Sequence, residues 1–379
     1  MLRSLDFFRN TERAVGYGRV GAEVADLLDA REVILTPSAP TRLICTNIAG
    51  IDGWWSHQRR VMWTMWETDR LPESYHGQFD DIDTLLVPCH ANVEAFSEHH
   101  RDVRLMPLGV NVDRWRPVAR TLEGPFIVMA GGRGWERKGI DLAITTFLNA
   151  LEGEDAELWL RVEGRIEQDP RLAHPQIKMI PRVADELPLY AQVHVFLALA
   201  RGEGFGLMPA QAICQGIPTI LTDAHGHREF SSFGWGVEAR KVPAGFGGLG
   251  DPGMWWEADV DEATGCLTSI YQGYDNASAA AWQLADVARE HLAWDIDRLL
   301  HHLELGPPVD RGVWMPHREP RGHEIRVQQP VRCDIAGRDL QFVPGETYHD
   351  SWNVKNVLHL NGSLDESLWS PSYREVVVR

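Results

Sequence analysis

The sequence of 379 residues predicts an α/β protein with two parallel-sheet domains that face each other across a cleft, followed by a small β-rich appendage. Two successive series of short apolar runs alternate with helix-like stretches, which is typical of strands joined by crossover helices. The chain is longer than one ordinary domain, and its hydrophobic content of 44% is enough for two buried cores. After residue 322 the alternation stops and short strand-like runs follow one another.

The first series predicts an N-terminal domain over residues 1–118. Helix-like stretches at residues 19–28 and 91–99 separate apolar runs that are short enough to be strands. Such spacing requires crossover connections and therefore a parallel sheet. The expected strands are residues 33–36, 42–47, 61–66, 84–87 and 103–106.

The second series predicts a further domain of the same kind over residues 119–305. Helices are expected at residues 140–151 and 207–215, and residues 277–305 have the mixed three and four spacing of one or two closing helices. The expected strands are residues 125–130, 157–162, 177–180, 193–200 and 218–221.

The last part of the chain changes in composition. Residues 306–322 are rich in Pro and Gly and are expected to be a linker, and residues 323–379 are expected to be a small β-rich module. Its role is left open between holding an acceptor, binding a partner and assembly. The expected strands are residues 324–327, 331–335, 340–343 and 375–378.

Charge and cysteine content exclude some classes of partner. A net charge of −17 with no basic patch makes nucleic acid an unfavourable partner. The five cysteines are scattered and form no metal-ligand or disulfide pattern, which is typical of reduced thiols in a cytoplasmic protein. No run resembles a targeting segment or approaches the ~18 apolar residues of a transmembrane helix.

One turn of the second domain carries a candidate anion site. The segment Met129-Ala-Gly-Gly-Arg-Gly-Trp-Glu-Arg-Lys-Gly139 follows an expected strand and precedes an expected helix, so Gly132, Arg133 and Lys138 lie where strand turns into helix. Fixed cations at such a turn stabilise a leaving group whose negative charge grows during the reaction. We therefore interpret Arg133 and Lys138 as residues that bind a diphosphate, and we call this pair the diphosphate grip.

A second turn, about seventy residues later, reads Arg201-Gly-Glu-Gly-Phe-Gly-Leu-Met-Pro-Ala-Gln211. It also joins a strand-like run to a helix-like run, so its backbone amides are free to meet an anion. The carboxylate of Glu203 repels phosphate, and its expected partners are the hydroxyls of a sugar ring. Together the two turns predict a site for a nucleoside diphosphate sugar.

These segments resemble the retaining glycosyltransferases of family 4, which have the GT-B fold. The family has a Glu followed by Gly-Phe-Gly and a second Glu eight positions after the first; Glu203 matches the first, and Gln211 replaces the second. Further segments in the family's order extend the resemblance over roughly residues 14 to 300. They are Trp66-Glu-Thr-Asp-Arg-Leu-Pro72, the run of residues 107–117, and Ala184-Asp-Glu-Leu-Pro-Leu-Tyr190.

The resemblance implies a metal-independent transferase that moves a hexose from a UDP- or GDP-sugar to a hydroxyl acceptor, be it a glycan, protein, lipid or small molecule. It implies catalytic roles for Arg133, Lys138 and Glu203, with Gln211 at the ribose. The implied donor-binding residues are Gly18, Gly132, Arg133, Lys138, Val183, Glu203, Gly204, Phe205, Gly206, Leu207 and Gln211. The implied acceptor-side residues are Tyr17, Trp66, Glu67 and His90.

Other functions remain open at this point. Gln211 and the extra C-terminal module also suit a binding or scaffolding protein of this fold that has lost turnover, and a sugar-nucleotide epimerase is a further alternative. Gly16-Tyr-Gly-Arg-Val-Gly21 fits a dinucleotide-binding pattern, but no acidic residue follows the next strand-like run. The pair His225 and His227 lacks a third ligand, so no metal site is expected.

Overall fold

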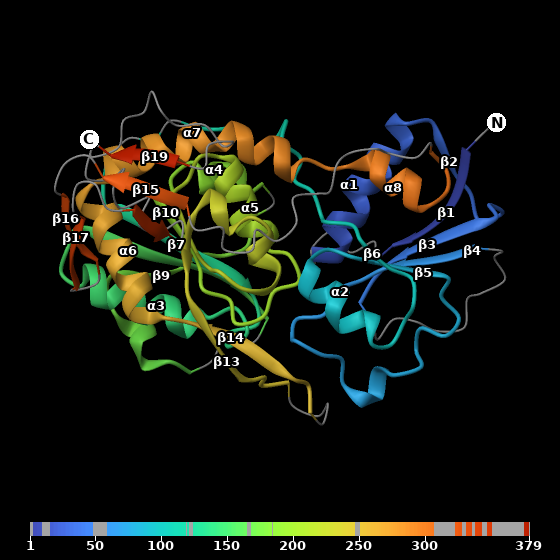
Figure 1. Cartoon of the computed structure of the whole chain (residues 1–379), viewed down its shortest axis with the longest axis horizontal. Helices are drawn as coiled ribbons and strands as arrows, with labels where there is room; N and C mark the ends of the chain where they lie inside the picture. Colours follow the sequence, from blue (N-terminus) through green and yellow to red (C-terminus); the bar gives the residue numbers. More distant parts are fainter. Residues whose placement is uncertain are drawn as a thin grey trace.

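The computed structural model describes residues 3–9, 16–47, 59–118, 120, 124–164, 168–183, 185–246 and 251–306, together with the backbone of five strands between residues 323 and 378. Two separate parallel sheets dominate it, each of six strands (Figure 1). The predicted α/β architecture is confirmed, and the expected linker of residues 306–322 lies almost entirely outside the described residues.

The first sheet has the strand order β2-β1-β3-β4-β5-β6, and all its neighbours pair in parallel. The helices α1 (Gly16–Ala30) and α2 (His90–Ser97) connect its strands. Val20, Val24 and Leu28 recur on one face of α1 and are buried in the core against the sheet. The strands are β1 (Arg3–Arg9), β2 (Val33–Leu35), β3 (Thr41–Cys45), β4 (Arg59–Trp63), β5 (Thr84–Val87) and β6 (Val103–Leu105).

Strand β1 was not predicted, although it lies between β2 and β3 in the sheet. Its sequence carries the charged residues Arg3, Asp6 and Arg9, which obscure the strand pattern. The structure buries Asp6 because Arg42 on the neighbouring strand pairs with it, with 2.9 Å between Arg42 Nε and Asp6 Oδ2. A buried carboxylate with a cationic partner is tolerated inside a sheet.

The second sheet has the order β12-β11-β10-β7-β8-β9, and the helices α3 (Ile140–Leu151), α5 (Leu207–Cys214), α6 (Val260–Gln272) and α7 (Tyr274–Leu292) surround it (Figure 1). The prediction missed β12 and α6. A short helix, α4 (Leu187–Tyr190), precedes β10. The strands are β7 (Phe126–Arg133), β8 (Ala156–Glu163), β9 (Ile177–Met179), β10 (Val195–Ala198), β11 (Thr219–Thr222) and β12 (Trp235–Val237).

An antiparallel hairpin, β13 (Ala239–Pro243) and β14 (Met254–Ala258), leaves the second domain and reaches the first. The carboxylate of Asp69 accepts a hydrogen bond from the backbone N–H of Met254 at 2.8 Å and forms an ion pair with the ammonium of Lys241 at 2.8 Å. The hairpin was not predicted from the sequence. The remaining short elements are the 3-10 helices η2 (Glu73–Tyr75), η3 (Pro170–Ala173), η4 (His225–Glu229) and η5 (Ser231–Phe233).

After α7 the chain returns to the first domain, where α8 (Ile296–His302) lies beside α1 (Figure 1). The indole N–H of Trp294 donates to Glu23 on α1 at 2.8 Å, and Arg59 donates to the carbonyl of His302 at 3.0 Å. Residues 293–305 therefore pack with the first domain, although the sequence places them after the second.

Beyond residue 306 the structure gives backbone only. The strands β15 (His323–Val327), β18 (Thr347–Asp350) and β19 (Glu375–Val378) form one sheet, and β16 (Val331–Ile335) pairs with β17 (Arg338–Phe342). Figure 1 shows these strands beside the second domain. In the described part of the chain, no helix is both long and apolar enough to cross a membrane.

Candidate active site

A cavity of about 440 Å³ lies between the two domains. Both sheets contribute to it through the segments that follow their strands at the carboxyl end, where ligands bind in open α/β sheets. The first domain supplies Tyr17, Arg19, Val20, Asn47, Met65, Trp66, Glu67, Tyr75 and Leu108. The second supplies Gly132, Arg133, Arg137, Lys138, Arg161, Glu163, Glu186, Glu203, Phe205, Gly206, Leu207 and Met208.

The turn between β7 and α3 carries the two predicted cations, Arg133 and Lys138, and both line this cavity. Gly132 has φ 139°, and the stem of Lys138 crosses directly over it, so that a Cβ at Gly132 would lie 2.8 Å from Lys138 Cε. Only glycine fits this close approach in this conformation. Arg133 is exposed at the cavity, and both predicted cations thus line it.

Lys138 is mostly buried, and its ammonium contacts the carboxylate of Glu203. The exposed fractions of the two side chains are 15% and 13%. Burial, and next the positive charge of Arg137, lowers the pKa of Lys138 to about 7, while the charge of Glu67 opposes the shift. The structure therefore brings together two residues that lie 65 positions apart in the chain and were predicted to serve the same site.

Glu203 begins the loop that leads into α5. Gly204 is required there because a Cβ would lie 2.5 Å from the sulfur of Met65, which belongs to the first domain. Gly206 has φ 106° and is the N-cap of α5, and Leu207 and Met208 at the start of that helix line the cavity. The free backbone amides of a helix start favour an anion at this wall.

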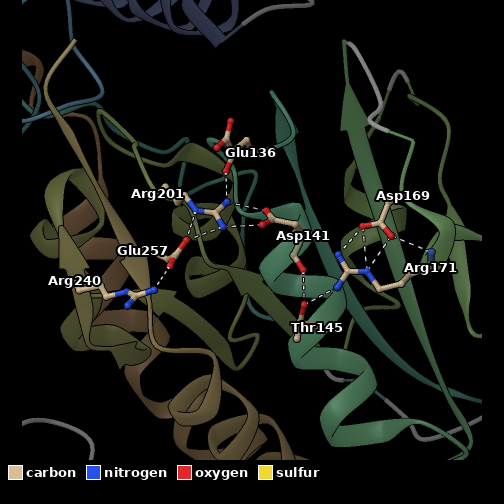
Figure 2. Close-up of polar contacts among 8 residues, drawn as sticks. All are labelled: Glu136, Asp141, Thr145, Asp169, Arg171, Arg201, Arg240 and Glu257. Atoms are coloured by element: carbon tan, nitrogen blue, oxygen red, sulfur yellow. Dashed lines mark hydrogen bonds and ion pairs between the residues drawn. The ribbon is translucent and has the colours of Figure 1, made fainter. Parts of the chain in front are cut away.

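Arg201 connects the loop of residues 203–206 (the Glu203 loop) to the turn of residues 131–138 that carries Arg133 and Lys138 (the cation turn). Figure 2 shows its guanidinium between the carboxylates of Asp141 on α3 and Glu257 on β14. The guanidinium donates to Asp141 at 2.7 and 2.8 Å and to Glu257 at 3.0 Å. It also donates to the carbonyl of Glu136 at 2.8 Å. Because Arg201 is only 7% exposed, these charge-assisted bonds fix the loop firmly against the turn.

Sequence reasoning missed several charged residues of the cavity. Arg161 on β8 is paired with Glu186 at 2.7 Å, and Glu186 reaches across to Arg19 of the first domain at 2.8 Å. Glu163 completes this group at 2.5 Å from Arg161. Arg161 and Glu163 are at the carboxyl end of a predicted parallel strand, which is a signal that could have found them.

The predicted acceptor-side residues divide into two groups. Tyr17, Trp66 and Glu67 line the cavity. His90 does not; its ring pairs instead with Glu229 of the second domain at 3.0 Å, and that hydrogen bond, followed by the negative charge of Glu229, raises the pKa of His90. In this arrangement His90 connects the domains.

Four predicted donor-side residues are not among those that line the cavity: Gly204, which packs against Met65, and Gly18, Val183 and Gln211. Gly18 is buried within α1, and Val183 is on the surface with 36% of its area exposed. Gln211 on α5 is 2% exposed, and its side-chain oxygen has no hydrogen-bond partner among the described residues. Across the same residues, no group of three or more His, Cys, Asp or Glu side chains is arranged to hold a metal ion.

Comparisons with known proteins fit this arrangement. Residues 124–245, which hold the cation turn and the Glu203 loop, match the family Glycosyl transferases group 1. Over 80% of its length the chain superposes on all of HepE of Anabaena, solved with UDP and glucose, with a TM-score of 0.58 and 12% identity. A glycosyltransferase of Rickettsia africae gives a TM-score of 0.54 at 12% identity over 80% of this chain and 98% of that one. The fold is GT-B.

The curated relatives are viral. A putative glycosyltransferase of Acidianus filamentous virus 1 is 23% identical over 201 residues, half of this chain. Another, from a Sulfolobus islandicus filamentous virus, is 49% identical over 41 residues, 11% of this chain. The chain spans only 60% and 12% of their lengths. In this GT-B protein the cavity lies between the two domains, and the segment that matches the family forms its second-domain wall.

Proposed function

We propose that this protein is a glycosyltransferase that moves a hexose from a nucleoside diphosphate sugar to a hydroxyl acceptor, with retention at the anomeric carbon and without a metal ion. The observation that carries the proposal is the convergence of Arg133, Lys138 and Glu203 on one cavity between two GT-B domains. The match of residues 124–245 to the group 1 family supports it.

The donor would occupy the second-domain wall. Its diphosphate would accept hydrogen bonds from Arg133, Lys138 and the amides at the start of α5, where positive charge is concentrated. The sugar hydroxyls would donate to the carboxylate of Glu203. Since Lys138 and Glu203 contact each other, donor binding exchanges that contact for one phosphate contact and one hydroxyl contact.

The proposed reaction is a front-face displacement. The acceptor oxygen forms a bond to the anomeric carbon while the bond from that carbon to the phosphate oxygen breaks, and the acceptor proton passes to the leaving phosphate. Negative charge on the diphosphate grows as it leaves, so Arg133 and Lys138 contribute more to the transition state than to the ground state. This course needs no separate general base.

A ligand screen followed by a turnover assay tests the proposal. UDP-, GDP- and ADP-sugars are added in a thermal-shift experiment, where a donor at a hundred times its dissociation constant stabilises the fold by about 2.7 kcal/mol. We expect a UDP- or GDP-sugar to shift the melting temperature and to be hydrolysed slowly. Turnover should persist with EDTA present. If no sugar nucleotide stabilises the protein, the proposed function is wrong.

The same assay addresses the alternatives. A binding or scaffolding protein would bind the donor without releasing nucleotide, and an epimerase would convert the sugar while it remains attached to the nucleotide. Neither is favoured by the relatives, which are both named putative glycosyltransferases. We also propose a reducing, cytoplasmic environment, which is supported by the four buried free cysteines of the described residues.

A further inference from the structure

His225 has an unusual backbone beside the Glu203 loop. Three non-glycine residues of the described chain have positive φ, and His225, with φ 50°, is the one that is buried, at 5% exposure. The other two, Glu32 and Glu304, are exposed. A side chain in the left-handed region costs free energy and persists only where the surrounding contacts require it, as happens near functional sites. The contacts of its ring therefore need an explanation.

The ring of His225 makes a hydrogen bond to the backbone of the Glu203 loop. Its Nδ1 lies 2.5 Å from the carbonyl oxygen of Glu203. Because a carbonyl oxygen only accepts, Nδ1 carries the ring proton and donates the hydrogen bond. The N–H of Gly226 donates to the same oxygen at 2.9 Å. Trp256 lies against the ring, with 4.7 Å between the centroids. Burial lowers the pKa of His225 to about 4, so the ring is neutral at pH 7.

The other ring nitrogen faces the first domain. Nε2 of His225 lies 3.3 Å from Nδ2 of Asn92, a fully buried residue of α2. Nδ2 of Asn92 also donates to the carbonyl of Trp66 at 2.7 Å, and its Oδ1 accepts from the N–H of Trp66 at 3.2 Å. A continuous buried chain of hydrogen bonds therefore runs from the Trp66 backbone through Asn92 and His225 to the Glu203 backbone.

Both ends of this chain lie at the cavity. Trp66 and its neighbour Glu67 line the first-domain wall, and Glu203 lines the second-domain wall. The carbonyl of Glu67 also lies close to Gly202, where a Cβ would come within 2.2 Å of it. The two walls thus meet through backbone and buried amide contacts, which permit little relative displacement.

We propose that His225 is a positioning residue that couples the Glu203 loop to the first domain through Asn92. It would thereby fix the position of the Glu203 carboxylate relative to the first-domain wall of the cavity. This inference rests on the proposed function of Glu203. Loss of the link should affect turnover more than nucleotide affinity, because a displacement of the reacting centre by about 1 Å costs roughly 100-fold in rate, while the diphosphate contacts lie on the second domain alone.

A double-mutant cycle of His225→Gly and Asn92→Ala tests the coupling. Glycine relieves the backbone strain while removing the ring, so this variant is expected to fold. With the sugar nucleotide that the wild type hydrolyses, we expect kcat to fall roughly 10- to 100-fold in each single variant. The double variant should lose no more than the stronger single one, since either change breaks the same chain. UDP affinity should stay within about twofold. Additive losses in kcat would overturn the proposal.

A second measurement does not depend on activity. Hydrogen–deuterium exchange of the peptide over residues 201–208 should accelerate in Asn92→Ala, although Asn92 is in the other domain. Lys241→Ala is the matched control, because it removes another interdomain contact, to Asp69, at an exposed position. It should leave exchange of residues 201–208 and kcat unchanged. Unchanged exchange in Asn92→Ala overturns the coupling, whereas a wild type that binds no nucleotide overturns the proposed function instead.

Discussion

The two walls of the cavity are built differently. The second-domain wall comes largely from two short turns, residues 131–138 and 203–208, whose glycines and charged residues form compact patterns. The first-domain wall is assembled from side chains on five separate segments, including Tyr17, Asn47 and Leu108. Chemistry that depends on strand-to-helix turns is therefore visible in a sequence. A surface that depends on distant segments meeting is visible only after folding.

The largest expected effect falls on the second-domain wall. Lys138→Ala should weaken UDP binding by roughly 10- to 100-fold, because a charge-assisted hydrogen bond is lost. The turnover number should fall further, since the leaving diphosphate gains charge in the transition state. Isothermal titration calorimetry and steady-state kinetics measure the two losses. Lys178→Ala, on β9 and outside the cavity wall, is the control; equal behaviour of the two variants would refute the diphosphate grip.

Glu203 of this wall and Gln211, which is buried on α5 and does not line the cavity, should separate rate from binding. Glu203→Ala should lower kcat by about 100-fold, because the sugar loses its positioning partner. Gln211→Ala should leave kcat unchanged and raise the donor KM by about 2- to 10-fold, the worth of one neutral hydrogen bond to the ribose. An unchanged KM would mean that the buried Gln211 supports the helix and does not contact the donor.

The low pKa of Lys138 predicts a pH dependence of donor binding. Burial lowers this pKa to about 7, so the free protein loses the positive charge as the pH rises through about 7. Bound diphosphate favours the charged form, so affinity for a UDP-sugar should be constant below about pH 6 and should fall above pH 7, by up to about tenfold per pH unit.

Proton uptake on binding gives an independent measure of the same shift. Titrations at about pH 8 in buffers of different ionisation enthalpy should show close to one proton taken up per donor. Lys138→Arg keeps its charge at all these pH values and should abolish both the uptake and the pH dependence. If uptake persists in Lys138→Arg, another group is responsible.

The smallest effect on nucleotide binding is expected from the first-domain wall. Asn47 of the first domain is exposed and lines the cavity. Asn47→Ala should leave UDP affinity within about twofold of wild type and should alter transfer to the acceptor. A UDP affinity reduced tenfold or more would show that the nucleotide contacts both walls, and the division between them would have to be redrawn.

Part of the fold could be predicted from local patterns. Helix α3 was predicted with its observed bounds, and every expected strand of the two domain sheets overlaps an observed strand. Strand β1 was missed because Asp6 and Arg3 mask its apolar residues, and burial of Asp6 depends on Arg42 from another strand. The hairpin β13 and β14 was missed because its contacts are with Asp69 of the other domain.

The sequence alone determined which residues are candidates for binding a sugar nucleotide, because Gly132, Lys138, Glu203 and Gly206 belong to turns that short segments specify through backbone sterics. The tertiary structure decided what those residues meet. It placed Lys138 against Glu203 and lowered the pKa of the lysine by burial. It also paired Glu186 with Arg161 of its own domain and with Arg19 of the first domain. Burial and long-range pairing depend on every segment that packs around a group, and so they cannot be read from its neighbours in the chain.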